Sequence, residues 1–172
     1  MHRMIAEFAA MSPAAGRLLI VGREDGQEGK AIIEEGKRML GSRLRVMEAN
    51  RELMPVIHGA ADVFCLCSTQ ELFGVVFLEA MATGRPCIGH RYPTTEWIIG
   101  DAGVCTDMTR PGDLAHELGR MQEASYRKAF AGRSRSRVEQ FFSATVVIPQ
   151  TIAMYKNVLG LDSPPTSSSV RP

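Results

Sequence analysis

Two glutamates, Glu71 and Glu79, stand eight positions apart in a segment that holds almost no other polar side chain. Burying a carboxylate is costly unless a partner compensates its charge. Between them, Gly74 falls where a loop is expected to turn into a helix. The start of a helix offers unpaired N–H groups and partial positive charge, which suit a phosphate. The segment therefore combines an anion site with two acceptors for hydroxyl groups, a combination that suits a nucleotide sugar.

A structural interpretation of the same residues stays open. Glu79 could pair with Arg85 or another base, and Glu71 could be an ordinary surface residue. Glu71 follows the apolar run 62–67 and a short polar turn, so we expect it at the carboxyl end of a strand. Ligands bind at that end of the sheet in open α/β folds.

The other apolar runs predict strands that alternate with helices. Strands are predicted over residues 18–21, 44–47, 62–67, 86–89 and, as a short one, 103–105. Helices are predicted over residues 4–11, 27–40, 51–59, 74–83, 113–122, 125–141 and 143–159. Asn50 can cap one helix, Gly84 can end another, and Pro149 is expected to bend or restart the last. The pattern indicates an α/β fold, a parallel sheet with helices on both faces.

The composition sets outer limits on the protein. A chain of 172 residues is long enough for one domain, which we place at residues 1–160, with a disordered tail over 161–172. Apolar residues make up 45% and the net charge is +1, which disfavours a disordered or nucleic-acid-coating protein. No apolar run reaches the roughly 18 residues of a membrane span. No signal-peptide core follows Met1, so a cytoplasmic location is predicted.

Several other residue groups have weaker claims to chemistry. Cys65 and Cys67 alternate on a predicted strand, and the four cysteines are expected to be buried reduced thiols rather than metal ligands. The glycines after residue 21 lack the dinucleotide-binding spacing. The histidines are scattered, and His90 is the one that could touch a ligand, although a structural role is favoured. The basic run 127–137 is expected to be a solvated helix face, with RNA or anionic membrane as its minor alternative.

The stretch from Ala61 to Gly89 resembles the carboxyl-terminal domain of retaining glycosyltransferases of family 4 (group 1). It shares the sequence ADVFCLCS, the E-x7-E spacing of Glu71 and Glu79, and the sequence EAMATGRPCIG that begins at Glu79. Residues 18–22 and the segment from Glu96 to Gly103 match an earlier strand and a later segment of the family. The resemblance covers roughly residues 4–160.

The resemblance implies a GT-B enzyme, two Rossmann-like domains with the active site between them, of which this chain would be the donor-binding half. Glu71 would face the hydroxyls of the donor sugar as the catalytic residue. Backbone N–H groups of Phe73, Gly74, Val75 and Val76 would contact the sugar and diphosphate, and Glu79 would hold the ribose. Neither metal nor another cofactor is expected, and retention would arise by front-face attack. The acceptor is unknown.

The same resemblance points to departures and absences. Cys67 replaces a usual proline, Leu72 a glycine, and Pro93–Thr95 a Gly-Gly turn. The family's first strand, whose Arg and Lys hold the diphosphate, is not in this sequence, and neither is the amino-terminal acceptor domain. Because that strand is central in the sheet, its neighbours must pair directly or leave their edges open.

The expected partners are a nucleotide-sugar donor, an acceptor, and the missing domain or a partner chain. Nucleic acid is not expected, and membrane contact only through the missing half.

Two alternatives to a transferase remain. The chain could be a non-catalytic remnant that holds a nucleotide or pairs with another chain, as the absent Arg and Lys suggest. A sugar phosphorylase or nucleotide-sugar epimerase of the GT-B class is weaker, because the sequence around EAMATGRP favours a transferase.

Overall fold

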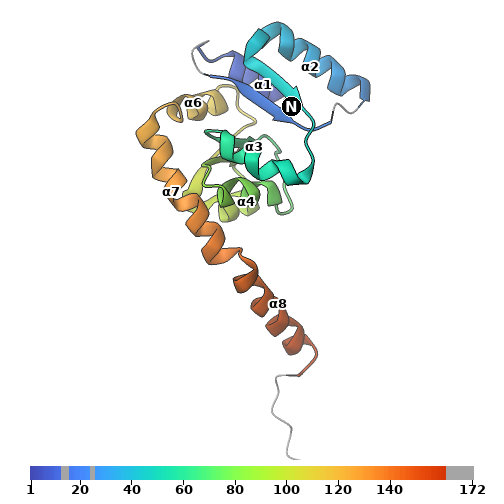
Figure 1. The fold of residues 1–172 in the computed structure, drawn as a ribbon, viewed down its shortest axis with the longest axis vertical. Coiled ribbons are helices and arrows are strands. Elements are labelled where there is room, and N and C mark those ends of the chain that lie inside the picture. Colours follow the sequence, from blue (N-terminus) through green and yellow to red (C-terminus); the bar gives the residue numbers. More distant parts are fainter. Residues whose placement is uncertain (13–15, 24–25, 162–172) are drawn as a thin grey trace, which may run out of the picture.

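The chain is an α/β protein with parallel strands flanked by helices, as the sequence predicts, but the strands form two small sheets rather than one (Figure 1). The computed structural model describes residues 1–12, 16–23 and 26–161. The strands are β1 (Leu18–Val21), β2 (Leu44–Met47), β3 (Phe64–Leu66), β4 (Cys87–His90) and β5 (Gly103–Thr106). The helices are α1 (His2–Ala9), α2 (Gly26–Leu40), α3 (Met54–Ala60), α4 (Val75–Ala82), α5 (Pro93–Ile99), α6 (Asp113–Arg120), α7 (Ala124–Phe141) and α8 (Ala144–Val158). Short 3₁₀ helices are η2 (Gly41–Arg43), η3 (Arg51–Leu53) and η4 (Gly100–Ala102).

The strands fall into two groups that do not pair with each other. β1 lies beside β2, with Leu18 opposite Leu44, and β4 lies between β3 and β5. All the pairings are parallel, so the carboxyl ends within each sheet share one edge. Of the two outcomes expected without a central first strand, the open one is found, because no pairing joins β1 to β3 in the part of the chain described.

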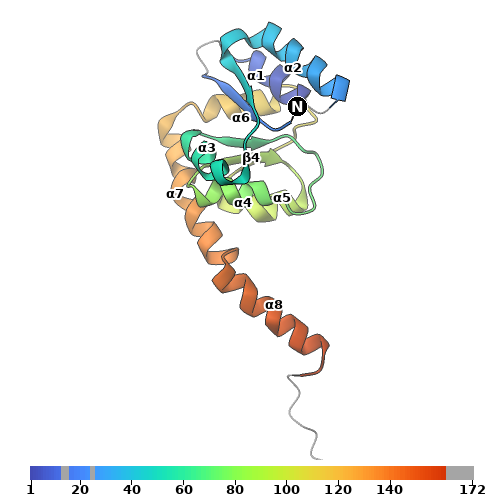
Figure 2. The same ribbon diagram turned by 45° about the vertical axis from the view of Figure 1, so that its right-hand side comes forward.

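The core lies on both faces of the three-stranded sheet. On one face Phe77 and Met81 of α4 pack with Ile98 and Ile99 of α5. The opposite face buries Ile88 against a set from α1, α6 and the following turns, namely Met4, Met108, Leu114 and Met121. The two-stranded sheet has a smaller cluster of its own, formed by Ile5, Phe8, Leu40 and Leu44. Figure 2 shows α1 and α2 beside the two-stranded sheet, and α3, α4 and α5 together on one side of the other.

A buried carboxylate joins the two groups. Glu7 of α1 accepts hydrogen bonds from the backbone N–H groups of Gly112 (2.9 Å) and Ala115 (3.0 Å), at the start of α6. These amides have no partner within their own helix, and a carboxylate suits the positive end of the helix. Glu7 therefore caps α6 from a distance of more than a hundred residues in sequence.

The basic run on α7 is more than a solvated face, which corrects the prediction. Arg127 donates to the backbone carbonyl of Met121 at 2.6 Å, and Arg137 donates to those of Ile98 and Trp97. Ser134, fully buried, donates to the carbonyl of Ala102 at 3.2 Å. These side chains satisfy carbonyls at the ends of other helices, so α7 fastens α5 and η4 to the body.

Beyond α7, helix α8 leaves the body (Figure 1). None of its residues is buried, and several large apolar side chains are exposed: Val147, Ile148, Ile152, Met154, Tyr155 and Val158. The helix continues through Pro149, so the expected restart does not occur. The predicted tail lies outside the described residues except for Leu161.

Most predicted elements are confirmed, and one helix was missed. Residues 93–95 are not a turn but the first residues of α5, with Pro93 at its first position. The cysteines are all free; Cys87 is buried and the other three are half-buried. A hydrogen bond with Cys67, together with burial, holds the pKa of the Cys65 thiol well above its usual range. Among the described helices, none is long and apolar enough to cross a membrane.

Candidate functional site

The site predicted around Glu71 is built on the start of α4. Gly74 precedes the helix in the left-handed conformation, with φ of +67°. A Cβ there would also lie 2.9 Å from Cδ2 of Phe77, so both backbone and packing require glycine. The first amide of this turn with an acceptor is that of Phe77, which donates to the Gly74 carbonyl at 2.9 Å. The N–H groups of Val75 and Val76 precede it and remain available to an anion.

Glu71 and Glu79 both belong to this segment and have no ionic partner. Each is half-buried, and within the described residues neither takes part in a salt bridge or hydrogen bond. The Cγ atom of Glu71 lies 3.9 Å from the position that a Cβ at Gly74 would take, so its side chain flanks the helix start. Glu79 lies four residues beyond Val75, about 6 Å further along the helix axis. The two carboxylates are thus separate acceptors, one in the loop before α4 and one within the helix.

The structural alternative for Glu79 is not found. Arg85 donates instead to the backbone carbonyls of Ala61, at 3.0 Å, and Thr83, at 3.3 Å. Its guanidinium therefore closes the turn between α4 and β4. The carboxylate of Glu79 stays free for another partner.

An aromatic cluster holds the loop that carries Glu71. The ring of Phe73 lies 6.3 Å from that of Trp97 on α5 and 6.2 Å from that of Phe142, which follows α7. Trp97 and Phe142 meet edge to face at 5.2 Å. Leu72, beside them, is 98% exposed and contributes nothing to this packing. Phe73 therefore has an anchoring role for its side chain in addition to its predicted backbone contact.

His58 lies on α3, which packs against the helix that carries Glu79, and the sequence patterns gave it no role. Its side chain, on α3, is 4% exposed and packs edge to face on Phe64, with ring centroids 5.3 Å apart. Burial lowers the pKa of His58, and the charge of Glu79 partly opposes this effect. No local pattern marks the residue, because the contact joins two helices that flank a strand.

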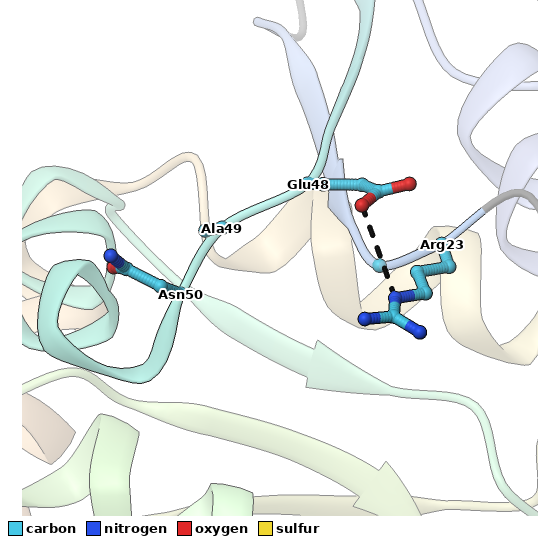
Figure 3. A pocket seen from close by; sticks show the side chains of 5 residues that line it. Arg23, Glu48, Ala49 and Asn50 are labelled. Carbon is cyan, nitrogen blue, oxygen red and sulfur yellow. Dashed lines mark ion pairs between the residues drawn. The ribbon is translucent and has the colours of Figure 1, made fainter.

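A hollow of about 310 Å³ opens at the carboxyl ends of β1 and β2. Its lining is formed by Gly22, Arg23, Glu48, Ala49 and Asn50. Figure 3 shows Arg23 and Glu48 facing each other, with Nε and Oε2 3.9 Å apart, while Asn50 points away. Asn50 caps η3, as its carboxamide oxygen accepts from the Leu53 amide at 3.1 Å. The predicted cap is confirmed, although it begins a 3₁₀ turn ahead of α3.

His90 has a structural partner. Its Nδ1 accepts a hydrogen bond from the backbone N–H of Met108 at 3.1 Å, which joins the end of β4 to the turn after β5. Across the described residues no three His, Cys, Asp or Glu side chains gather where a metal could bind. The expectation that the reaction needs no metal stays a prediction.

The parallel α/β layers define a class of protein by their fold, the carboxyl-terminal domain of a GT-B glycosyltransferase. Residues 1–123 match the family model described as glycosyl transferases group 1, and the chain belongs to that family. Assignment to family 4 within it stays a prediction.

Relatives and solved structures agree with this membership. The chain is 30% identical over 148 residues, 83% of its length, to N-acetyl-alpha-D-glucosaminyl L-malate synthase of Bacillus anthracis. It is 34% identical over 109 residues, 61% of its length, to O-antigen chain mannosyltransferase B of Escherichia coli. Sucrose-phosphate synthase from Thermosynechococcus elongatus superposes on 93% of the chain with a TM-score of 0.78 at 25% identity. Anabaena HepE, solved in complex with UDP, superposes on 92% with a TM-score of 0.80 at 22% identity, which shows the fold.

The chain spans less than half of the length of each of these proteins. It covers 38% of the Bacillus enzyme, 28% of the Escherichia enzyme, 43% of the synthase and 45% of HepE. The match is therefore to one domain of each.

Proposed function

We propose that this chain is the donor-binding part of an enzyme that transfers a sugar, with retention of configuration, from a nucleotide diphosphate sugar to an acceptor. The observation that carries the proposal is the free pair, Glu71 and Glu79, on either side of unpaired amides at the start of α4. Three groups of the donor then have matching partners, with no metal needed. Glu71 accepts from the sugar hydroxyls, Glu79 accepts from the ribose, and the amides face the diphosphate.

The similarity to nucleotide-sugar enzymes supports the donor class. Several structural neighbours were solved with UDP, and one of these, HepE, also with UDP-glucose. The relatives act on different acceptors by their names, so the acceptor of this chain is left open.

By the resemblance, turnover requires an Arg and a Lys that hold the diphosphate. The described residues do not place such a pair there. The edge of β1 that does not pair with β3 and the exposed apolar side chains of α8 both offer surfaces to a further polypeptide. We therefore propose that the chain binds the donor, and that transfer needs an additional domain, on the same or a partner polypeptide. The DNA upstream of Met1 tests this directly: an in-frame strand ending in Gly-Arg, with a Lys a few residues on, supports the proposal. A stop codon there, with no such segment nearby, supports the alternative of a non-catalytic binding remnant.

Titration calorimetry with UDP, GDP and ADP, and with their glucose and mannose derivatives, tests donor binding. Glu79→Gln should weaken the best nucleotide by roughly 5- to 150-fold, equivalent to about 1–3 kcal/mol for hydrogen bonds to a charged group. Glu71→Gln should weaken the sugar derivative but leave the free diphosphate unchanged. Glu139→Gln, in an exposed pair with Arg135 on α7, is the matched control and should change neither. Unaltered affinity in both site variants would refute the assignment.

A further inference from the structure

His58 is a buried side chain with an unsatisfied polar atom. Its Nε2 is shielded from solvent and has no hydrogen-bond partner among the described residues. A buried polar group without a partner is unfavourable, because it has lost its hydrogen bonds to water and gained none. The ring itself is firmly held, since it packs on Phe64, which in turn packs edge to face on Phe77 at 5.7 Å. His58 is thus fixed in orientation while one nitrogen has no partner.

Glu79 lies on α4, the helix that packs against α3 and supplies Phe77 to the aromatic contact with Phe64. It is the charged group that acts on the titration of His58. Glu79 is equally unpartnered in the part of the chain described, so a potential donor and a free acceptor lie on facing helices. A side-chain rotation of Glu79 is a small change compared with moving either helix.

We propose that His58 is a positioning residue for Glu79: its imidazole N–H holds the carboxylate in the rotamer that receives the ribose. This inference rests on the proposed function, in which Glu79 binds the ribose hydroxyls. One carboxylate oxygen accepts from the imidazole, and the other remains for the ribose diol. A neutral imidazole is sufficient, because its protonated nitrogen is a donor. Binding then satisfies both groups at once.

Three single variants, one double variant and two nucleotides separate this role from a structural one. His58→Phe keeps the aromatic packing on Phe64 but has no donor, whereas His58→Gln keeps a donor N–H. Each is titrated with UDP and with 2′,3′-dideoxy-UDP, beside wild type and Glu79→Gln, and urea unfolding monitors stability. If GDP or ADP binds more tightly, its matching dideoxy analogue is used.

The expected result is a selective loss. Wild type should prefer the ribose form by roughly tenfold or more, Glu79→Gln should abolish the preference, and His58→Phe should reduce it at least threefold. His58→Gln should restore part of it, and the dideoxy analogue should bind equally well to all four proteins. Adding His58→Phe to Glu79→Gln should have no further effect. If the role of His58 were merely structural, His58→Phe would weaken the binding of both nucleotides alike.

The experiment distinguishes failure of the proposed function from failure of the inference about His58. If wild type shows no preference for the ribose form, or binds no nucleotide, the proposed function fails and this inference with it. If wild type prefers the ribose form and Glu79→Gln abolishes the preference, but His58→Phe retains it, the inference alone is overturned. A readout without ligand is the imidazole titration of His58 by NMR. Its pKa should fall further in Glu79→Gln, and an unchanged value would overturn the coupling.

Discussion

The two sheets of this protein differ in how completely they are buried. In the three-stranded sheet, Cys87, Ile88 and Gly89 of β4 are shielded on both faces by helices. In the two-stranded sheet, β1 is only half-buried, and Leu19 at its middle is 42% exposed. The candidate site belongs to the better-packed sheet, through β3 and α4. The difference indicates that the candidate site is built on the more deeply buried sheet, while part of β1 is exposed.

The largest test of this difference is removal of a core ring. Phe77→Ala should cost about 3–5 kcal/mol of unfolding free energy, because the ring is 1% exposed and packs below Gly74 and against Phe64. Leu19→Ala is the matched change in the other sheet and should cost under about 1 kcal/mol. Urea unfolding followed by circular dichroism measures both. Equal losses would mean that the two sheets are equally packed.

The next largest loss of stability is expected at Gly74, the glycine at the start of α4. Gly74→Ala should cost about 2–3 kcal/mol, since it adds crowding against Phe77 to the strain of a left-handed residue. Gly112→Ala is the control: it also precedes a helix with positive φ, but an added Cβ would meet nothing within 4 Å. It should lose only about 1–2 kcal/mol. The same denaturation series, with calorimetry of the nucleotide, decides; a larger loss at Gly112 would contradict the packing argument.

The link that Glu7 makes between the two sheets can be weakened by replacing one oxygen of its carboxylate. Glu7→Gln removes the negative charge that caps α6 and should cost about 1 kcal/mol. Hydrogen exchange should accelerate at the Gly112 and Ala115 amides. Glu34→Gln, which breaks an exposed pair with Lys37, is the control and should be nearly neutral. If both substitutions behave alike, Glu7 does not join the halves.

The smallest effect expected is a dependence on pH. The pKa of His58 is lowered in the folded state, so the unfolded chain binds more protons below the ordinary value of 6.5. Stability should therefore be full above pH 6.5 and fall as pH drops toward the folded pKa, by at most about 1 kcal/mol between pH 6.5 and 5.5. Comparison of wild type with His58→Phe isolates this contribution. A difference between them that stays constant over this range would exclude it.

Local signals were sufficient for most of the framework. Short apolar runs that end in glycine or a polar turn marked the strands, and Gly74 and Gly84 bounded α4 within a residue. The sequence alone did not settle whether Glu71 and Glu79 lack partners. For Glu79 the answer depends on which acceptors receive the hydrogen bonds of Arg85. Helix α5 was missed although a signal existed: Pro93 at a first helical position, with buried Ile98 and Ile99 before Gly100.

Contacts distant in sequence had no such signal. Glu7 and Gly112 are 105 residues apart, and neither lies in a pattern that points to the other. His58 was one of several scattered histidines, since its burial arises from the packing of α3 beside β3 and α4. The charge of the basic residues on α7 predicted a solvent-facing surface. Two of them, Arg127 and Arg137, instead donate to backbone carbonyls of helices that end nearby in space. Sequence spacing describes one element at a time, and these contacts join two.

Helix α8 has a mechanical consequence. Fifteen residues at about 1.5 Å each make it about 22 Å long, and it joins the body only through the short link after α7. A rotation of roughly 15° at that link would carry its far end through about 6 Å, by the geometry of a rigid rod of this length. Anything held along its apolar side chains would travel with it. For a rigid rod of this length, any change of angle at the link is therefore largest at the far end of the helix.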